Sequence, residues 1–183
     1  TLKSLLQGLN PLQILGSTDI AIEEVIFDSR KAGPGKLFVA VKGVQVDGHQ
    51  FIPQVVQANT SALIVETIPE NVPDQVTIVQ VANSAQALGF LATAFYEHPS
   101  RQLSLVGVTG TNGKTTTVTL LFDLFSGLGF KCGLLSTVEN RIAGQVIAST
   151  HTTPDAVAIN ALLAQMVEAG CEYAFMEVSS HAV

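Results

Sequence analysis

The chain has 183 residues, 47% of them hydrophobic, and its 9 basic and 15 acidic side chains give a formal net charge of −6. This length and composition fit one or two soluble domains, and the negative balance gives no general attraction to nucleic acid or anionic lipid. No apolar run approaches the roughly 18 residues of a membrane span, and no segment resembles a signal peptide. Cys132 and Cys171 lie in apolar surroundings without disulfide or metal spacing. We therefore expect both thiols to be reduced and buried, as in a cytoplasmic protein. We also expect a monomer that is not inserted in a membrane.

Residues 1–98 are predicted to form one α/β domain. Short apolar segments predict strands within residues 20–29, 36–43, 61–66 and 76–81. Asp47 is a possible helix cap, and Asn83 is the expected N-cap of a later helix that places Leu88, Leu91, Ala92 and Phe95 on one face. Pro99 is expected to stop that helix, so we place a linker at residues 99–103.

Residues 104–183 alternate between strand and helix patterns. The segment "LSLVGVT" predicts a strand buried on both faces of a parallel sheet. A helix is then expected from Lys114, a strand in "KCGLLST", a hairpin or an excursion in "ENRIAGQVIAS", a helix between Pro154 and Gly170, and a strand in "EYAFMEVSS". This order predicts right-handed crossovers and a parallel sheet. A parallel sheet of only about three strands would have exposed edges. We therefore expect residues 104–183 to form an incomplete nucleotide-binding domain.

The stretch "GTNGKTT" lies between a predicted strand and a predicted helix, the context in which phosphate-binding loops occur. Glycines there let consecutive N–H groups point into one concavity, and the helix N-terminus adds partial positive charge. Lys114 can reach the β and γ phosphates of ATP, and the Thr115 hydroxyl can bind Mg²⁺. The predicted ATP-binding residues are Gly110, Thr111, Asn112, Gly113, Lys114, Thr115 and Thr116.

This loop departs from the strict phosphate-loop pattern, because Val108 occupies the position of the first glycine. Glycines at positions 107, 110 and 113 also fail the dinucleotide-binding spacing. The alternative is a glycine-rich strand-to-helix turn that carries a surface lysine. Nothing structural requires Gly-Lys-Thr-Thr together, which favours phosphate binding.

The segment "GVTGTNGKTTT" resembles the ATP-binding loop of the Mur ligase family. The segments "THTTPDA" and "MEVSSHAV" resemble the members that add the third amino acid of the cell-wall precursor, and "FDSRKAGPGKLFVAVKG" with "DGHQFI" resembles their N-terminal domain. The resemblance covers essentially the whole chain. It implies an α/β domain for the UDP-substrate at 1–98, followed at 104–183 by a truncated ATP-binding domain with a phosphate loop and a parallel sheet.

The resemblance also assigns site residues outside the loop. Glu177, at the end of a predicted strand, would hold Mg²⁺ together with Thr115. The expected position of that strand end, near the glycine-rich loop, also suggests this role. The alternative is that the Glu177 carboxylate bonds to neighbouring backbone. Ser29 would contact the UDP part of the substrate, although the sequence around it also fits an ordinary turn. Thr152, Thr153 and Ser179 would bind the muramoyl-peptide part, with Thr153 as an alternative helix cap.

The reaction that this resemblance implies joins a diamino acid to UDP-N-acetylmuramoyl-L-alanyl-D-glutamate. ATP phosphorylates the D-glutamate carboxylate, and the amino group then attacks the acyl phosphate, with Lys114 as the catalytic residue and Mg²⁺ as cofactor. Specificity for meso-2,6-diaminopimelate or L-lysine stays open, with diaminopimelate favoured, because the selecting domain lies outside these residues. We expect the 183 residues alone to be inactive. The alternatives are another ligase of the superfamily, such as a folylpolyglutamate synthetase, and a non-catalytic nucleotide-binding module.

Overall fold

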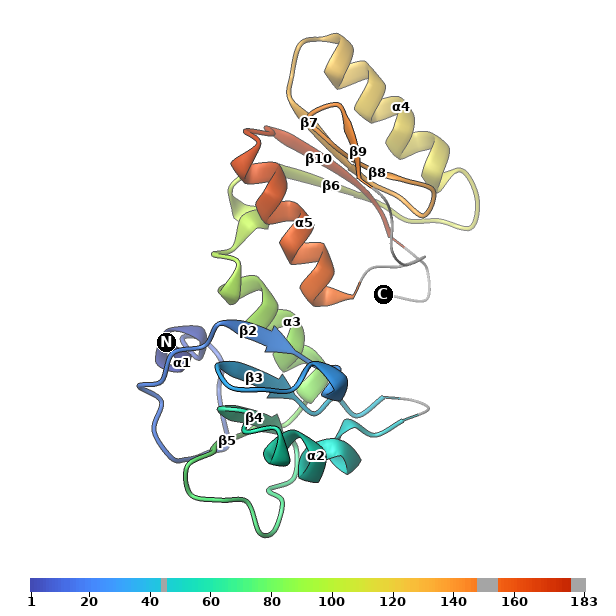
Figure 1. The fold of residues 1–183 in the computed structure, drawn as a ribbon. Helices are drawn as coiled ribbons and strands as arrows, with labels where there is room; N and C mark the ends of the chain where they lie inside the picture. The colour runs from blue at the N-terminus through green and yellow to red at the C-terminus, as the bar shows by residue number, and fades with distance from the viewer. Residues whose placement is uncertain (44–45, 148–154, 179–183) are drawn as a thin grey trace. The chain divides into compact units, whose positions relative to one another are not determined.

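The computed structural model describes residues 1–43, 46–147 and 155–178. Contacts between Cα atoms divide the chain into two compact units, Thr1–Phe95 and Tyr96–Val183, each with its own five-stranded sheet (Figure 1). The predicted α/β class is confirmed. None of the helices within the described ranges combines the length and hydropathy that crossing a membrane requires.

The first unit places helices on a mostly parallel sheet. Its elements are α1 (Leu2–Leu5), β1 (Gln13–Leu15), β2 (Glu24–Ile26), η1 (Ser29–Lys31), β3 (Lys36–Val39), η2 (Gly48–Phe51), α2 (Ile52–Gln57), β4 (Ala62–Val65), β5 (Thr77–Gln80) and α3 (Ser84–Phe95). The strand order is β1-β5-β4-β3-β2, with only β1 antiparallel to its neighbour. The predicted strands and α3 are confirmed, while α1 and β1 were not predicted.

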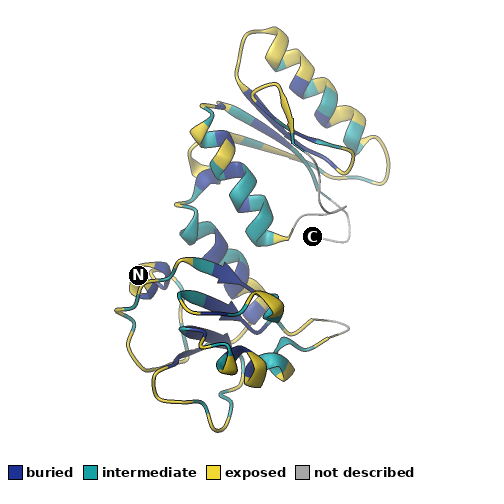
Figure 2. Ribbon diagram, viewed as in Figure 1, coloured by how far each residue is buried: buried dark blue, intermediate teal, exposed yellow. Residues whose placement is uncertain are grey.

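Both faces of this sheet are covered, which is why its central strands are continuous apolar runs. Phe38 and Leu63 belong to a cluster with Ile52 and Val55 of α2. Their neighbours along the strands are also fully buried, and α3 packs against β2, β3 and β4. Figure 2 shows the central strands in the colour of buried residues.

Side-chain caps begin the helices as predicted, but Pro99 does not end α3. The Asn83 side chain accepts the Gln86 N–H at 2.9 Å, and Asp47 caps η2 by accepting the His49 N–H at 2.9 Å. Helix α3 ends at Phe95, before Glu97 and His98 adopt φ of 59° and 54°. Pro99 instead opens the short helix η3 (Pro99–Arg101).

The second unit is a three-layer arrangement. Its further elements are β6 (Ser104–Val108), α4 (Lys114–Gly127), β7 (Cys132–Leu135), β8 (Asn140–Ile142), β9 (Gln145–Ile147), α5 (Ala156–Glu168) and β10 (Tyr173–Glu177). The strand order is β6-β10-β7-β8-β9, with β6, β10 and β7 parallel and β8–β9 forming the predicted hairpin. Helix α4 packs with Leu134 and Phe175 on one face, and α5 packs with Leu135 and Ala174 on the other.

The prediction that the "LSLVGVT" strand is buried on both faces does not hold within these 183 residues. Among the described strands β6 pairs with β10 alone, and Val106 is 38% exposed. The apolar run thus does form a strand of this sheet, but its other edge is open here, unlike those of the central strands β7 and β10. The cysteines do agree with expectation: Cys132 and Cys171 are free and buried, and burial raises the pKa of both thiols.

Helix α5 approaches its sheet closely at Gly133. A Cβ atom at this position of β7 would overlap the side chain of Met166, which is fully buried. Glycine is therefore required for the packing of α5 on β7. By contrast, a Cβ at Gly89 of α3 would meet nothing within 4 Å.

We predict that Gly133→Ala destabilises the second unit by about 1–3 kcal/mol, the usual cost of overpacking. The matched change Gly89→Ala should instead stabilise the first unit by about 0.5–1 kcal/mol, because alanine favours an open helical position. Urea unfolding of both variants measures these differences. Equal stability of Gly133→Ala and the original chain would show that Met166 repacks freely.

Candidate functional site

Three strand ends meet at one edge of the second sheet. Strand β10 lies between β6 and β7, and in the register Glu177 is level with Val108 of β6 while Met176 is level with Leu135 of β7. All three strands are parallel, so their carboxyl ends share this edge. Crevices at such edges are where α/β sheets bind ligands.

The glycine-rich loop connects the end of β6 to the start of α4. Gly110 and Gly113 have φ of 148° and 81°, a backbone region that other residues rarely adopt. The Lys114 ammonium folds back over the loop and donates to the Gly110 carbonyl oxygen at 2.7 Å. Thr111, Asn112 and Gly113 are exposed. The loop therefore presents backbone and one cation to solvent, with no bulky side chain between them.

The N-terminus of α4 differs from those of the other long helices. Asn83 and Asp155 cap α3 and α5 with side-chain oxygens, whereas Gly113, the N-cap of α4, makes no such bond. The first N–H groups of a helix lack partners within it and carry partial positive charge. The start of this 14-residue helix can therefore receive an anion.

Glu177 faces this loop from the end of β10. Its Oε2 accepts the Thr115 hydroxyl at 2.9 Å, and it also lies 3.2 Å from the Thr137 hydroxyl and 3.4 Å from the Thr137 N–H. Thr115 belongs to the first turn of α4, and Thr137 follows β7. Thr137 was not predicted; the only signal for it was a hydroxyl residue just after a strand.

Thr115 and Glu177 fit a magnesium ion. Hydroxyl and carboxylate oxygens are the ligands that Mg²⁺ prefers. The Thr115 hydroxyl and the Glu177 carboxylate lie 2.9 Å apart, so one ion could contact both. Within the described ranges no group of three or more His, Cys, Asp or Glu side chains could hold a metal.

Ser29 lies in the first unit and lines a cavity of 490 Å³, hereafter the Ser29 cavity. Phe27 and Phe51 contribute aromatic surface to it, and the stretches on either side of residues 44–45 contribute Val41, Gly43, Val46 and Gly48. An apolar cavity with a few polar groups is typical of small-molecule sites.

The turn that carries Ser29 is held by its neighbours. Asp28 accepts hydrogen bonds from the Arg30 backbone N–H at 3.0 Å and from its guanidinium at 2.6 to 3.1 Å. These bonds, the side-chain ones first, lower the pKa of Asp28 to about 2. Because Arg30 is 84% exposed, we expect this pair to shape the turn more than to stabilise the fold.

The remaining predicted substrate residues, Thr152, Thr153 and Ser179, lie outside the described residues. The alternative that Thr153 caps the following helix is wrong, because Asp155 is the N-cap of α5 and accepts the Ala158 N–H at 2.8 Å. The structure thus brings Lys114, Thr115 and Glu177 together in the second unit and places Ser29 in the first.

Comparison with known families finds two matches that together take in most of the chain. Residues 21–96 match the model described as "Mur ligase family, catalytic domain", and residues 108–183 match the "Mur ligase middle domain". The second match contains the glycine-rich loop, Thr137 and Glu177.

Curated relatives and solved structures agree with these matches. The UDP-N-acetylmuramoyl-L-alanyl-D-glutamate–2,6-diaminopimelate ligase of Cytophaga hutchinsonii is 54% identical over 99% of the chain and 37% of its own length. A solved structure of a ligase of that name is similar over 87% of this chain and 32% of its own, with a TM-score of 0.69 and 26% identity.

A third similar protein is the MurF ligase of Thermotoga maritima in complex with ADP, with a TM-score of 0.55 and 26% identity over 86% of this chain and 32% of its own. The chain thus spans little more than a third of the length of its curated relatives. With both domain matches, which together take in residues 21–96 and 108–183, the chain belongs to the Mur ligase family.

Proposed function

We propose that this chain is part of an ATP-dependent ligase that adds the third residue to UDP-N-acetylmuramoyl-L-alanyl-D-glutamate in peptidoglycan synthesis. One observation carries the proposal: the Thr115–Glu177 contact at an uncapped helix N-terminus, in a chain 54% identical to a ligase named for that substrate. The relatives' names support 2,6-diaminopimelate as the added residue.

The chemistry requires an anionic carboxylate to approach the polyanionic tail of ATP. The γ-phosphoryl group passes to the D-glutamate carboxylate, ADP leaves, and the diamino acid's amino group then displaces phosphate from the acyl carbon and loses a proton. Concentrated positive charge lowers the barrier to the first step. In this chain the Lys114 ammonium and the amides at the start of α4 would supply it. No enzyme nucleophile is required.

Mg²⁺ would be held by Thr115 and Glu177 and would neutralise phosphate charge. The other members of the loop, Gly110, Thr111, Asn112, Gly113 and Thr116, would line the path of the phosphates. The similar MurF structure in complex with ADP supports a nucleotide in this family.

The Ser29 cavity would bind the UDP part of the precursor. Its apolar lining suits a pyrimidine base, and the Ser29 hydroxyl can bond to a polar group of the nucleotide. We retain Thr152, Thr153 and Ser179 as proposed contacts of the muramoyl-peptide part. Because ATP and the UDP-linked precursor are soluble nucleotides, we place the reaction in the cytoplasm. We also expect a monomer.

The activity is tested in the intact protein that contains this chain. With ATP, Mg²⁺ and the UDP-linked dipeptide, we expect phosphate release that depends on meso-diaminopimelate and is much slower with L-lysine. The 183 residues alone should show no turnover. A preference for L-lysine would show that lysine, and not diaminopimelate, is the added residue. Turnover by the 183 residues alone would refute the prediction that they are inactive.

Replacing Lys114 by alanine should weaken ATP binding to the intact protein about tenfold to a hundredfold. This corresponds to a charged hydrogen bond of about 1.5–3 kcal/mol. Titration calorimetry measures it, and Lys131→Ala, which removes an exposed lysine from the same unit, is the control. ATP binding that survives Lys114→Ala unchanged would mean that the loop does not hold the phosphates.

Replacing Thr137 by valine should reduce the affinity for Mg²⁺ in the presence of ADP about twofold to tenfold, because Glu177 loses one of its donors. Thr137→Ser should restore it, and Thr117→Val, at an exposed position of α4, should have no effect. Titration of Mn²⁺ by electron paramagnetic resonance measures metal binding without turnover. Equal affinity in Thr137→Val and Thr137→Ser would exclude a role for this hydroxyl.

A further inference from the structure

One wall of the Ser29 cavity is built from two short stems, residues 41–43 and 46–49. Val41, Gly43, Val46 and Gly48 line the Ser29 cavity, whereas Lys42, Asp47 and His49 line a second cavity of 320 Å³. The stems therefore separate two cavities, and their residues face one or the other. The contacts that hold the stems on the side of the second cavity therefore affect the shape of the Ser29 cavity.

Backbone bonds join the stems to each other. Gly48 donates to the Val41 carbonyl at 2.8 Å, Gly43 donates to that of Val46 at 3.1 Å, and Lys42 and Asp47 form an antiparallel bridge. A Cβ at Gly43 or Gly48 would lie 2.8 Å from backbone atoms of the opposite stem. The stems thus pair at a distance that only glycine permits.

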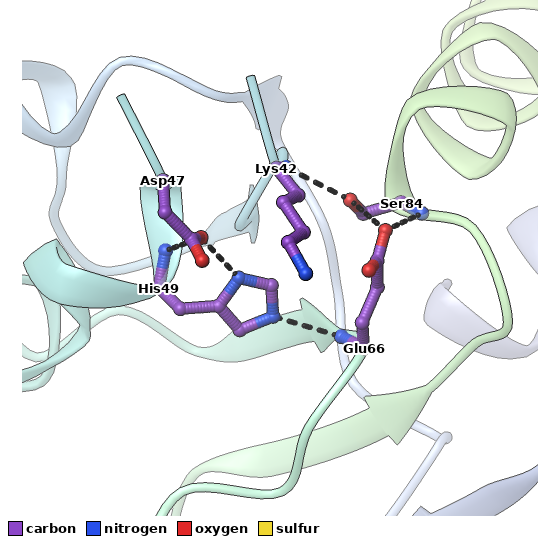
Figure 3. A network of polar contacts seen from close by, with 5 residues as sticks. All are labelled: Lys42, Asp47, His49, Glu66 and Ser84. Carbon is purple, nitrogen blue, oxygen red and sulfur yellow. Dashed lines mark hydrogen bonds and ion pairs between the residues drawn. The ribbon is translucent and has the colours of Figure 1, made fainter. Parts of the chain in front are cut away.

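His49 joins the second stem to strand β4. Its Nδ1 lies 2.7 Å from Asp47 Oδ1, and its Nε2 accepts the Glu66 N–H at 2.9 Å (Figure 3). Since Nε2 must offer a lone pair to that N–H, the ring is neutral with its hydrogen on Nδ1. The same Asp47 oxygen accepts the His49 N–H, and these bonds, the backbone one first, lower the pKa of Asp47.

Glu66 and Ser84 continue the path to the first stem. Glu66 Oε1 accepts the Ser84 N–H at 2.9 Å and its hydroxyl at 2.8 Å, which lowers the pKa of the Glu66 carboxyl. The Ser84 Oγ in turn accepts the Lys42 N–H at 3.1 Å. The path from Asp47 to Lys42 therefore runs through the end of β4 and the start of α3, as the dashed lines of Figure 3 show.

We propose that His49 is a positioning residue which, through Asp47, Glu66 and Ser84, holds the two stems in the arrangement that forms the wall of the Ser29 cavity. The proposal rests on the proposed function in one respect, that the cavity receives the UDP part of the substrate. His49 would not touch that ligand, because its ring lines the other cavity. Its effect on binding would be transmitted by Gly48 and Val46.

Two measurements test this inference separately from the proposed function. Nuclear magnetic resonance of the 183-residue chain follows the amides of Gly43, Gly48 and Glu66, which report the stems and the His49 bond. Calorimetry of the intact protein measures its affinity for UDP. The variants are His49→Phe, which keeps a ring but removes both nitrogens, and Ser84→Ala, which interrupts the path elsewhere. His98→Phe makes the same change in the other unit and serves as the control.

We expect both variants to shift the amide resonances of Gly43 and Gly48 and to weaken UDP binding about tenfold. In His49→Phe, hydrogen exchange at the Glu66 amide should also become about tenfold faster. His98→Phe should do none of these. Unchanged Gly43 and Gly48 amides in a folded Ser84→Ala or His49→Phe variant would overturn the inference, whatever happens to UDP. Absence of UDP binding by the unmodified protein would instead refute the proposed use of the cavity, and the amide shifts would still decide the role of His49.

Discussion

The contact of one carboxylate with two threonines holds together the candidate site of the second unit. Glu177 ends β10, Thr115 begins α4 after β6, and Thr137 follows β7, so a single oxygen connects segments from three strand ends. The contact requires β10 to lie between its two partners. The first turn of α4, which carries Thr115, has no side-chain cap because its N-cap residue is Gly113. In the function that we propose, the Mg²⁺ ligands would therefore lie next to the amides that receive the phosphates, as charge neutralisation of a polyphosphate requires.

In the first unit, the connection between β3 and α2 forms one wall of the Ser29 cavity. Glycines allow the stems to pair closely, and side chains on the opposite side tie them to β4 and α3. A polar network of this kind is stabilising only if its members are satisfied, and here the bonds run from Asp47 to Lys42 without a break. The segment "DGHQFI" thus contributes two side chains, Asp47 and His49, to this network.

Much of this could be predicted from sequence, because the signals were local. Apolar runs indicated β3, β4, β7 and β10, Asn83 and Asp47 indicated caps, and the Gly-Lys-Thr-Thr stretch indicated the loop. Strand order was not local: a pattern does not say that β7 lies next to β10, so Thr137 was missed. The predicted burial of β6 fails within these 183 residues, where β6 pairs with β10 alone among the described strands. The hydrogen bonds around His49 could not be predicted either, because Glu66 and Ser84 are distant from it in sequence and come near it only in the folded unit.

The position of β10 also constrains how the second unit is made. Strands β6 and β7 each pair with β10 and not with each other, although β10 is the last of the three to be synthesised. A nascent chain leaving the ribosome must therefore keep facing edges of both strands open until the third arrives. Such unpaired edges are sites of mispairing and aggregation. Chaperone protection during translation would matter most in the interval between the emergence of β7 and that of β10.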